Sequence, residues 1–200
     1  TRQEIERAYN ICSDLGRVAK AVAEKGIRGI REFTVSMGEP IRPMLAERLG
    51  SPEEILDKLG GKCMAEYKYD GERVQAHKDS DNIVLFSRRL ENITEQYPDA
   101  VDLVRKFVKP KQAIIEAEIV AIDPDTGEMR PFQELMHRRR KYAIRQAMQE
   151  YPVSLHAFDA LYVDGKDLTQ AAYPTRHKTL EKIIGKSDRV RPAEYLITDK

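Results

Sequence analysis

The stretch that decides the fold is EYKYDGER at residues 66–73, which follows the uncharged residues 63–65. The pair Asp70-Gly71 predicts a two-residue hairpin turn, because glycine tolerates the positive φ that such turns need. Residues 63–68 and 73–77 then form the two strands, and alternation places Glu66 and Lys68 on one face. The sequence therefore predicts a lysine at a strand end, beside a carboxylate and before a tight turn.

Lys68 is a candidate nucleophile on this reading. A lysine amine attacks only when it is neutral, and burial or neighbouring cations lower a lysine pKa. A strand end that lines a pocket can provide these conditions. The alternative is an ordinary solvated lysine on a surface hairpin, which is the better interpretation of Lys68 taken alone. The rest of the chain has to decide between the two.

The composition describes a chain that can bury a core but has little excess charge. Of its 200 residues 41% are hydrophobic and 34% charged, with a net charge of +1. Any nucleic-acid surface must therefore come from local patches. Cys12 and Cys63 match no metal-ligand spacing and no disulfide framework, which favours a reducing, cytoplasmic location. No apolar run approaches the length of a membrane span, and we find no signal peptide.

Periodicity predicts helices first and a strand-rich region after residue 62. Helical spacing covers residues 1–25, interrupted by a cap at Ser13-Asp14, and Gly and Pro in 33–43 suggest a domain boundary near residue 36. Mixed strands and helices without regular βαβ alternation predict an α+β fold with mainly antiparallel sheets. Further helices are predicted at 52–59, 98–108, after the basic run 138–141 to about 150, and at 174–184, and strands at 82–87, 112–123 and 153–163.

Two further segments carry charged groups suited to phosphate or metal. Arg88 and Arg89 stand at a predicted strand end, where a planar guanidinium can bind phosphate through two hydrogen bonds; a solvated charge pair is the alternative. Glu116 and Glu118 share one face of an otherwise apolar strand. A buried carboxylate is costly unless it is paired or metal-bound, so the surrounding Ile and Val favour a functional role over a wet edge strand.

Two more segments are ambiguous. Phe158, inside the strand 153–163, is either a core residue or a platform for stacking a base, and core is the better interpretation on its own. Phe132-Gln133 and the basic run 138–141 either contact phosphate or form a solvated helix start.

Taken in order, these segments resemble the motifs of ATP-dependent DNA ligases. Residues 68–73 fit K-x-D-G-x-R, a signature shared with RNA ligases and mRNA capping enzymes. The motifs that follow are FSRRLENIT at 86–94, EAE at 116–118, PFQ at 131–133 and AFDALYVDG at 157–165. The wording of FSRRLENIT is most similar to the archaeal replicative type, which is related to the eukaryotic enzymes. The resemblance implies an ATP-grasp-like nucleotidyltransferase (adenylation) domain over 37–200. Residues 1–36 resemble the last helices of an all-α DNA-binding domain.

The resemblance assigns roles to the candidate residues. Lys68 would attack the α-phosphate of ATP and carry AMP as a phosphoramidate, Glu66 would read the adenine amino group, and Phe158 would stack on adenine. The AMP would pass to the 5′-phosphate at a nick in duplex DNA, and the 3′-hydroxyl would displace it. Such an enzyme acts in DNA replication, repair and recombination, and a sliding clamp is a possible partner through other regions of the protein.

The charged candidates follow in the same way. Arg73 and Arg88 would contact ribose and phosphate, and Glu118 the ribose or a magnesium-linked network, so ATP and Mg²⁺ are the implied cofactors. The family's third motif commonly reads Asp-Gly-Glu, and here only Glu118 matches its fixed carboxylate, so Glu116 receives no role. The fourth and fifth motifs and the OB-fold domain are expected beyond Lys200.

Two other functions compete with nick sealing. An RNA ligase or a capping-type nucleotidyltransferase shares the lysine motif, but the helices of 1–36 and the FSRRLENIT string favour a DNA ligase. The other is a non-catalytic DNA-binding module, against which the intact Lys68, Arg73 and Glu118 speak.

Overall fold

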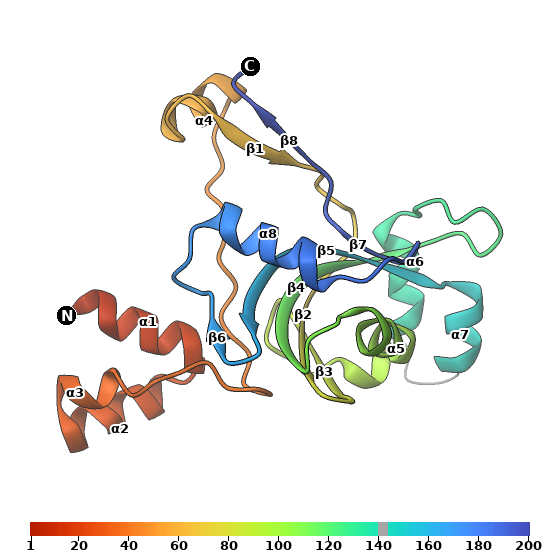
Figure 1. The fold of residues 1–200 in the computed structure, drawn as a ribbon. Coiled ribbons are helices and arrows are strands. Elements are labelled where there is room, and N and C mark those ends of the chain that lie inside the picture. Colours follow the sequence, from red (N-terminus) through yellow and green to blue (C-terminus); the bar gives the residue numbers. More distant parts are fainter. Residues whose placement is uncertain (140–143) are drawn as a thin grey trace.

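The protein has a mixed architecture in the computed structural model, which describes residues 1–139 and 144–200 (Figure 1). Three N-terminal helices lie to one side, a six-stranded sheet with flanking helices forms the body, and a separate two-stranded sheet extends away from it. Apart from the parallel pair β5 and β7, the strand pairs are antiparallel. The predicted α+β class with mainly antiparallel sheets is confirmed.

The bounds of the elements follow the predicted ones closely in the body of the chain. The helices are α1 (Arg2–Cys12), α2 (Leu15–Lys25), α3 (Ile27–Ile30), α4 (Pro52–Lys58), α5 (Pro98–Phe107), α6 (Phe132–Met136), α7 (Ile144–Glu150) and α8 (Tyr173–Ile183), with 3₁₀ turns η1 (Thr94–Gln96) and η2 (His137–Arg139). The strands are β1 (Cys63–Glu66), β2 (Glu72–Asp79), β3 (Asn82–Ser87), β4 (Gln112–Ala121), β5 (Val153–Val163), β6 (Lys166–Asp167), β7 (Val190–Pro192) and β8 (Tyr195–Thr198).

The N-terminal helices pack on one another. Asp14 is the N-cap residue of α2. Its carboxylate accepts hydrogen bonds from the backbone N–H groups of residues 16 and 17 at 2.8 and 3.1 Å, which would otherwise have no partner within the helix. The predicted cap is therefore confirmed. Buried Ala8, Cys12, Val18 and Ile30 form a small core that is distinct from that of the sheet.

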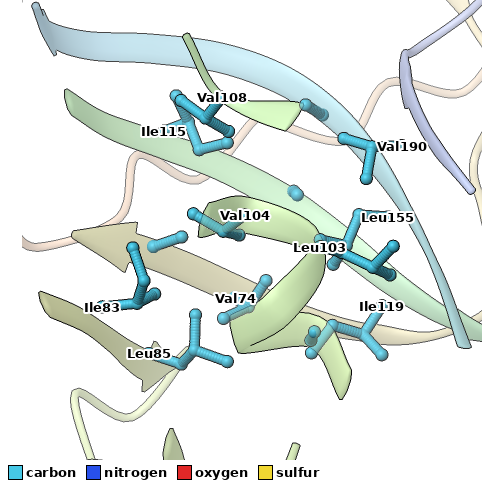
Figure 2. Packing of buried hydrophobic residues seen from close by; sticks show 14 of the residues in the cluster. Val74, Ile83, Leu85, Leu103, Val104, Val108, Ile115, Ile119, Leu155 and Val190 are labelled. Atoms are coloured by element: carbon cyan, nitrogen blue, oxygen red, sulfur yellow. The ribbon is translucent and has the colours of Figure 1, made fainter. Parts of the chain in front are cut away.

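The large sheet separates an apolar face from a polar one. Its strand order is β3-β2-β4-β5-β6, with β7 beside β5, and Arg73 of β2 lies opposite Glu118 of β4. Because side chains alternate, Val74 and Ile119 point to the face that α5 covers, where they pack with Leu155 and other aliphatic residues (Figure 2). Arg73 and Glu118 consequently point to the opposite face, which the chain segment before α4 partly covers.

The hairpin predicted at Asp70-Gly71 is not formed. β1 pairs with β8, with Glu66 opposite Tyr195, whereas β2 pairs with β3 and β4. Lys68 therefore follows the end of β1 in an irregular segment and does not share a strand face with Glu66. A short turn signal cannot reveal that the strand before it pairs with one that lies about 130 residues further along the chain.

Gly71 is required for a different reason from the predicted one. It is not among the positive-φ glycines. A Cβ atom at this position would lie 2.1 Å from the carbonyl oxygen of Ile119, so only glycine permits the close approach of the two backbones. The signature glycine thus brings the segment that follows Lys68 against β4.

Arg138, the first residue of the basic run 138–141, does not take part in the phosphate-contacting patch that one interpretation gave this run. The Arg138 side chain is buried and pairs through both terminal nitrogens with Asp99, at 2.6 and 2.9 Å, above the ring of Tyr97. A buried, paired arginine is a structural group. Residues 140–143, which complete the run, lie outside the described residues.

Among the residues that the structure describes, no helix has both the length and the apolar character needed to cross a bilayer.

Candidate functional site

An open cleft of about 1310 Å³ lies beside the polar face of the large sheet and is lined by residues from both sheets. All of the candidate residues line it, namely Glu66, Lys68, Arg73, Arg88, Glu118 and Phe158. They come from five different strands or strand ends, so the fold gathers residues that are up to 92 positions apart in the sequence.

Lys68 is held at the cleft by its neighbours in the chain. The ring of Tyr69 stacks on His156 of β5 at 4.1 Å between ring centroids, and Asp70 accepts the N–H of Phe132 at 3.1 Å. These contacts fix the backbone on the C-terminal side of the lysine. The Lys68 side chain itself is exposed, and its amine donates to the backbone carbonyl of Tyr69 at 3.2 Å.

The carboxylate that interacts with Lys68 is Glu118, not the predicted Glu66. Burial raises the pKa of Glu118 to about 7, and the nearby cations of Lys68 and Arg73, with the N–H of Gly71, oppose this rise. Glu118 is therefore a carboxyl group that exchanges its proton near neutral pH inside the cleft. A bound cation would keep it ionised.

Arg73 is held by several partners at once. Its guanidinium donates to the buried carboxylate of Glu116, donates to the carbonyl oxygen of Met44 at 3.3 Å, and lies 5.2 Å from the centre of the Phe158 ring. Gln75 donates to the second oxygen of Glu116 at 3.2 Å. Glu116 thus has a role that motif matching did not assign, which is to hold Arg73 in position.

The same network ties the segment before α4 to the sheet. Gln75 donates to the carbonyl oxygen of Ile41 at 2.9 Å and accepts the N–H of Ile41 at 2.8 Å. His77 accepts the N–H of Gly38 through Nδ1 at 3.1 Å, which leaves Nε2 to donate to Gln75 at 2.8 Å. Burial lowers the pKa of His77 to about 4, so the imidazole is neutral, as the bond from Gly38 requires.

Phe158 occupies a β-bulge. In the register of β4 with β5, Glu116 lies opposite Asp159 and Ala117 opposite Ala157, so Phe158 has no partner on β4. A bulge redirects the extra side chain, and here Phe158 is half-buried and lines the cleft. It is not a member of the buried apolar cluster. The interpretation of Phe158 as a core residue, which was better on sequence alone, is therefore wrong.

Glu66 and Arg88 line the cleft from two other elements. Glu66 ends β1, and its Oε1 atom lies 2.6 Å from the hydroxyl of Tyr173 on α8. Arg88 and Arg89 follow β3 in a turn that Ser87 stabilises by accepting the N–H groups of residues 89 and 91 at 3.2 and 3.3 Å. Both arginine side chains are exposed, so their guanidinium groups are open to a ligand.

Sequence reasoning missed several residues of the cleft. Met44 and Arg48 line it from an irregular segment without any motif. Tyr173, which is not among the lining residues but contacts Glu66, lies on α8, a helix to which we assigned no chemical role. None of these positions carries a local signal. The placement of carboxylates within an apolar strand indicated that they are paired or metal-bound, but it did not identify Arg73 as the partner of Glu116.

Comparisons with known proteins agree on one family. Residues 43–200 match the family model described as "ATP dependent DNA ligase domain". The chain is 56% identical over 98% of its length to a DNA ligase of Hyperthermus butylicus, and 55% identical over 99% of its length to a probable DNA ligase of Aquifex aeolicus. It covers 32% and 34% of those two proteins, so the chain spans about a third of the length of the curated relatives it matches.

Solved structures of DNA ligases also match this chain. A mycobacterial DNA ligase D complexed with ATP and MES matches with a TM-score of 0.51 and 25% identity, over 68% of this chain and 40% of that one. A structure titled Pmar-Lig_Pre. matches over 92% of this chain and 43% of that one, with a TM-score of 0.53; at 20% identity it supports the fold alone.

Proposed function

The chain belongs to the ATP-dependent DNA ligase family, and from this premise we propose that it provides the adenylation site of an enzyme that seals nicks in duplex DNA. The observation that carries the proposal is the cleft into which Lys68, Glu118 and Phe158 converge. The cleft brings together a nucleophile, an ionisable carboxylate and an aromatic ring. These are the groups that transfer of a nucleotide to a lysine requires.

Each group has a defined task in the first step. The neutral amine of Lys68 forms a bond to the α-phosphorus of ATP, the bond to pyrophosphate breaks, and the amine loses a proton to solvent. Phe158 stacks on adenine, and Glu66 accepts a hydrogen bond from its amino group. Arg88 neutralises phosphate charge, which is a large part of catalysis in phosphoryl transfer.

Arg73 acts on the nucleotide from a fixed position. Glu116 and the carbonyl of Met44 restrain its guanidinium beside the ring of Phe158. In this position Arg73 contacts the ribose side of a nucleotide that is stacked on Phe158. A restrained arginine binds with a smaller entropy cost than a mobile one.

Magnesium fits the site as an ion held mainly by substrate. The described residues contain no group of three or more His, Cys, Asp or Glu side chains that could enclose a metal. Mg²⁺ commonly binds one or two carboxylates and completes its shell with phosphates and water. Glu118 supplies such a carboxylate, and the ion, when bound, offsets the negative charge of the phosphates.

The later steps complete the proposed reaction. The adenylate passes from Lys68 to the 5′-phosphate of a nick, and the 3′-hydroxyl then forms the phosphodiester bond and releases AMP. We assign residues 1–36 to the end of a DNA-binding domain and residues 37–200 to the adenylation domain, because α1–α3 have a core of their own. Roles in replication, repair and recombination, a nucleoid location and a sliding-clamp partner remain predictions.

The test uses the full-length protein that contains this chain. Incubation with α-labelled ATP and Mg²⁺, followed by denaturing electrophoresis, is expected to give a labelled protein band that added pyrophosphate removes. The same protein is then offered nicked duplex DNA and nicked duplex RNA. Failure to form the labelled band contradicts the proposal, and sealing of RNA alone supports an RNA ligase in its place.

A further inference from the structure

The carboxylate of Glu66 is contacted by two residues of α8, of which Tyr173 makes a hydrogen bond to it. The hydroxyl oxygen of Tyr173 lies 2.6 Å from Oε1 of Glu66 and 2.9 Å from the carbonyl oxygen of Phe158. Nε2 of His177 lies 3.7 Å from the same Oε1 atom. His177 is buried, and its Nε2 atom has no hydrogen-bond partner among the described residues. One oxygen of Glu66 is therefore enclosed on the α8 side.

Tyr173 links the two groups that the proposed function directs at adenine. A hydroxyl has one proton to donate, and the shorter contact, to a charged acceptor, makes Glu66 the preferred partner. The second contact brings the same oxygen against the backbone of Phe158. The position of Glu66 relative to the stacking ring is thus set through one side chain.

The helix that carries Tyr173 is firmly attached to the sheet. Arg176, one turn further along α8, donates to both carboxylate oxygens of Asp159, at 2.8 and 3.0 Å, and both side chains are buried. Asp159 is the residue next to Phe158 on β5. The Arg176 guanidinium also lies 5.3 Å from the centre of the Tyr173 ring. Tyr173 is consequently a rigid support.

We infer that Tyr173 is a positioning residue that sets the specificity of this site for adenine, by fixing Oε1 of Glu66 so that Oε2 is presented to the 6-amino group. The inference rests on the proposed function, since it assumes that adenine binds beside Glu66 and Phe158. A carboxylate that is free to rotate could accept a hydrogen bond in several orientations. It would therefore discriminate less between a purine that carries the 6-amino group and one that lacks it.

The experiment compares two nucleotides that differ only in the donor. Equilibrium dissociation constants for ATP and for purine riboside 5′-triphosphate, which lacks the 6-amino group, are measured by calorimetry on the full-length protein without DNA. The variants are Tyr173→Phe, which keeps the ring, and Tyr195→Phe as the matched control. Tyr195 also packs against the ring of His177, at 4.8 Å between ring centroids, and its hydroxyl has no hydrogen bond with a described residue.

We expect Tyr173→Phe to weaken ATP binding by roughly threefold to tenfold and to change binding of purine riboside triphosphate by less than about twofold. Tyr195→Phe should alter neither constant. Equal weakening of both nucleotides, or no change for ATP, overturns the inference. The same holds if the wild type forms the labelled adenylate yet binds both nucleotides equally. A wild type that forms no labelled adenylate instead overturns the proposed function.

Discussion

The two sheets contribute to the cleft in different ways. On the large sheet Arg73 is restrained by Glu116, Met44 and the ring of Phe158, within strands whose other face is packed against α5. On the small sheet β8 exposes apolar side chains, and the Lys68 amine, just after β1, donates a hydrogen bond to the adjacent carbonyl of Tyr69. Arg73, which would hold the nucleotide, is thus fixed in advance, whereas the nucleophile Lys68 keeps its side-chain freedom.

This contrast predicts the largest effect at Lys68. We expect Lys68→Ala in the full-length protein to abolish the labelled protein–AMP band, while sealing of a nick that already carries AMP is partly retained, because the lysine acts as nucleophile only in the first step. Thermal unfolding should be unchanged, since the side chain is exposed. A variant that still labels at another lysine would refute the assignment of the nucleophile.

Substitutions of the two carboxylates of β4 should affect different properties, namely the rate of adenylation for Glu118 and the stability of the fold for Glu116. Glu118→Gln is expected to slow adenylation by about 10²–10³-fold, the scale for removal of one electrostatic group from a transition state, with little change in unfolding. Glu116→Gln should act mainly on the free energy of unfolding, by about 1–3 kcal/mol, because it leaves Arg73 without its charged partner. Single-turnover labelling measures the rate of adenylation and denaturant unfolding measures stability. If both variants lose labelling to the same extent, the two carboxylates do not have separate roles.

Strands β2 to β5 of the large sheet were predictable because their sequence pattern is local, whereas the short strands β6 and β7 were not predicted. The spans of β3 and β5 match the predicted 82–87 and 153–163, and β4 ends at Ala121 instead of 123. The partner of β1 was not predictable, because its pairing with β8 depends on residues far along the chain. The turn signal at Asp70-Gly71 was correct in residue type and wrong in cause, since the glycine serves a close backbone contact.

Residue chemistry alone marked Lys68, Arg88 and Glu118 as candidates, but their specific roles, and those of the other candidates, came only from the resemblance to ligase motifs. Each of them lines the cleft, but its surroundings could not be deduced. That Arg73 is engaged by Glu116, that Phe158 projects from a bulge and that Tyr173 contacts Glu66 all depend on strand register and helix packing. These are tertiary properties with no short sequence signal.

His77 tests whether the polar face of the large sheet is stabilised by the segment that covers it, residues 38–41. Because burial lowers its folded pKa to about 4, the unfolded chain binds the proton more tightly between about pH 6.5 and pH 4. The contribution of His77 is complete above the unfolded pKa and is lost as the pH falls towards 4, by about 2–3 kcal/mol. Urea unfolding between pH 7 and pH 4 measures it.

The control for this effect is His77→Asn, whose amide oxygen can replace Nδ1 as the acceptor of the Gly38 N–H. It should make the free energy of unfolding less dependent on pH over the same interval. A variant with the same pH dependence as the wild type would show that other groups dominate the acid sensitivity of the sheet and its covering segment.

Phe158 gives the smallest and most selective effect. We expect Phe158→Ala to weaken ATP binding by about 1–3 kcal/mol, the usual scale for stacking of a base on an aromatic ring. The free energy of unfolding should fall less than for Leu155→Ala on the same strand, which removes a fully buried side chain and is expected to cost about 2–5 kcal/mol. The measurements are nucleotide affinity and urea unfolding of both variants.

The difference between these two positions follows from the bulge. Leu155 is paired in the ladder and points into the core, whereas Phe158 is the unpaired residue that projects into the cleft. If Phe158→Ala unfolds as easily as Leu155→Ala while ATP affinity in the surviving folded protein is unchanged, then Phe158 is a packing residue. The cleft would in that case offer charge and hydrogen bonds to a nucleotide but no stacking surface, and Glu66 alone would have to bind the base.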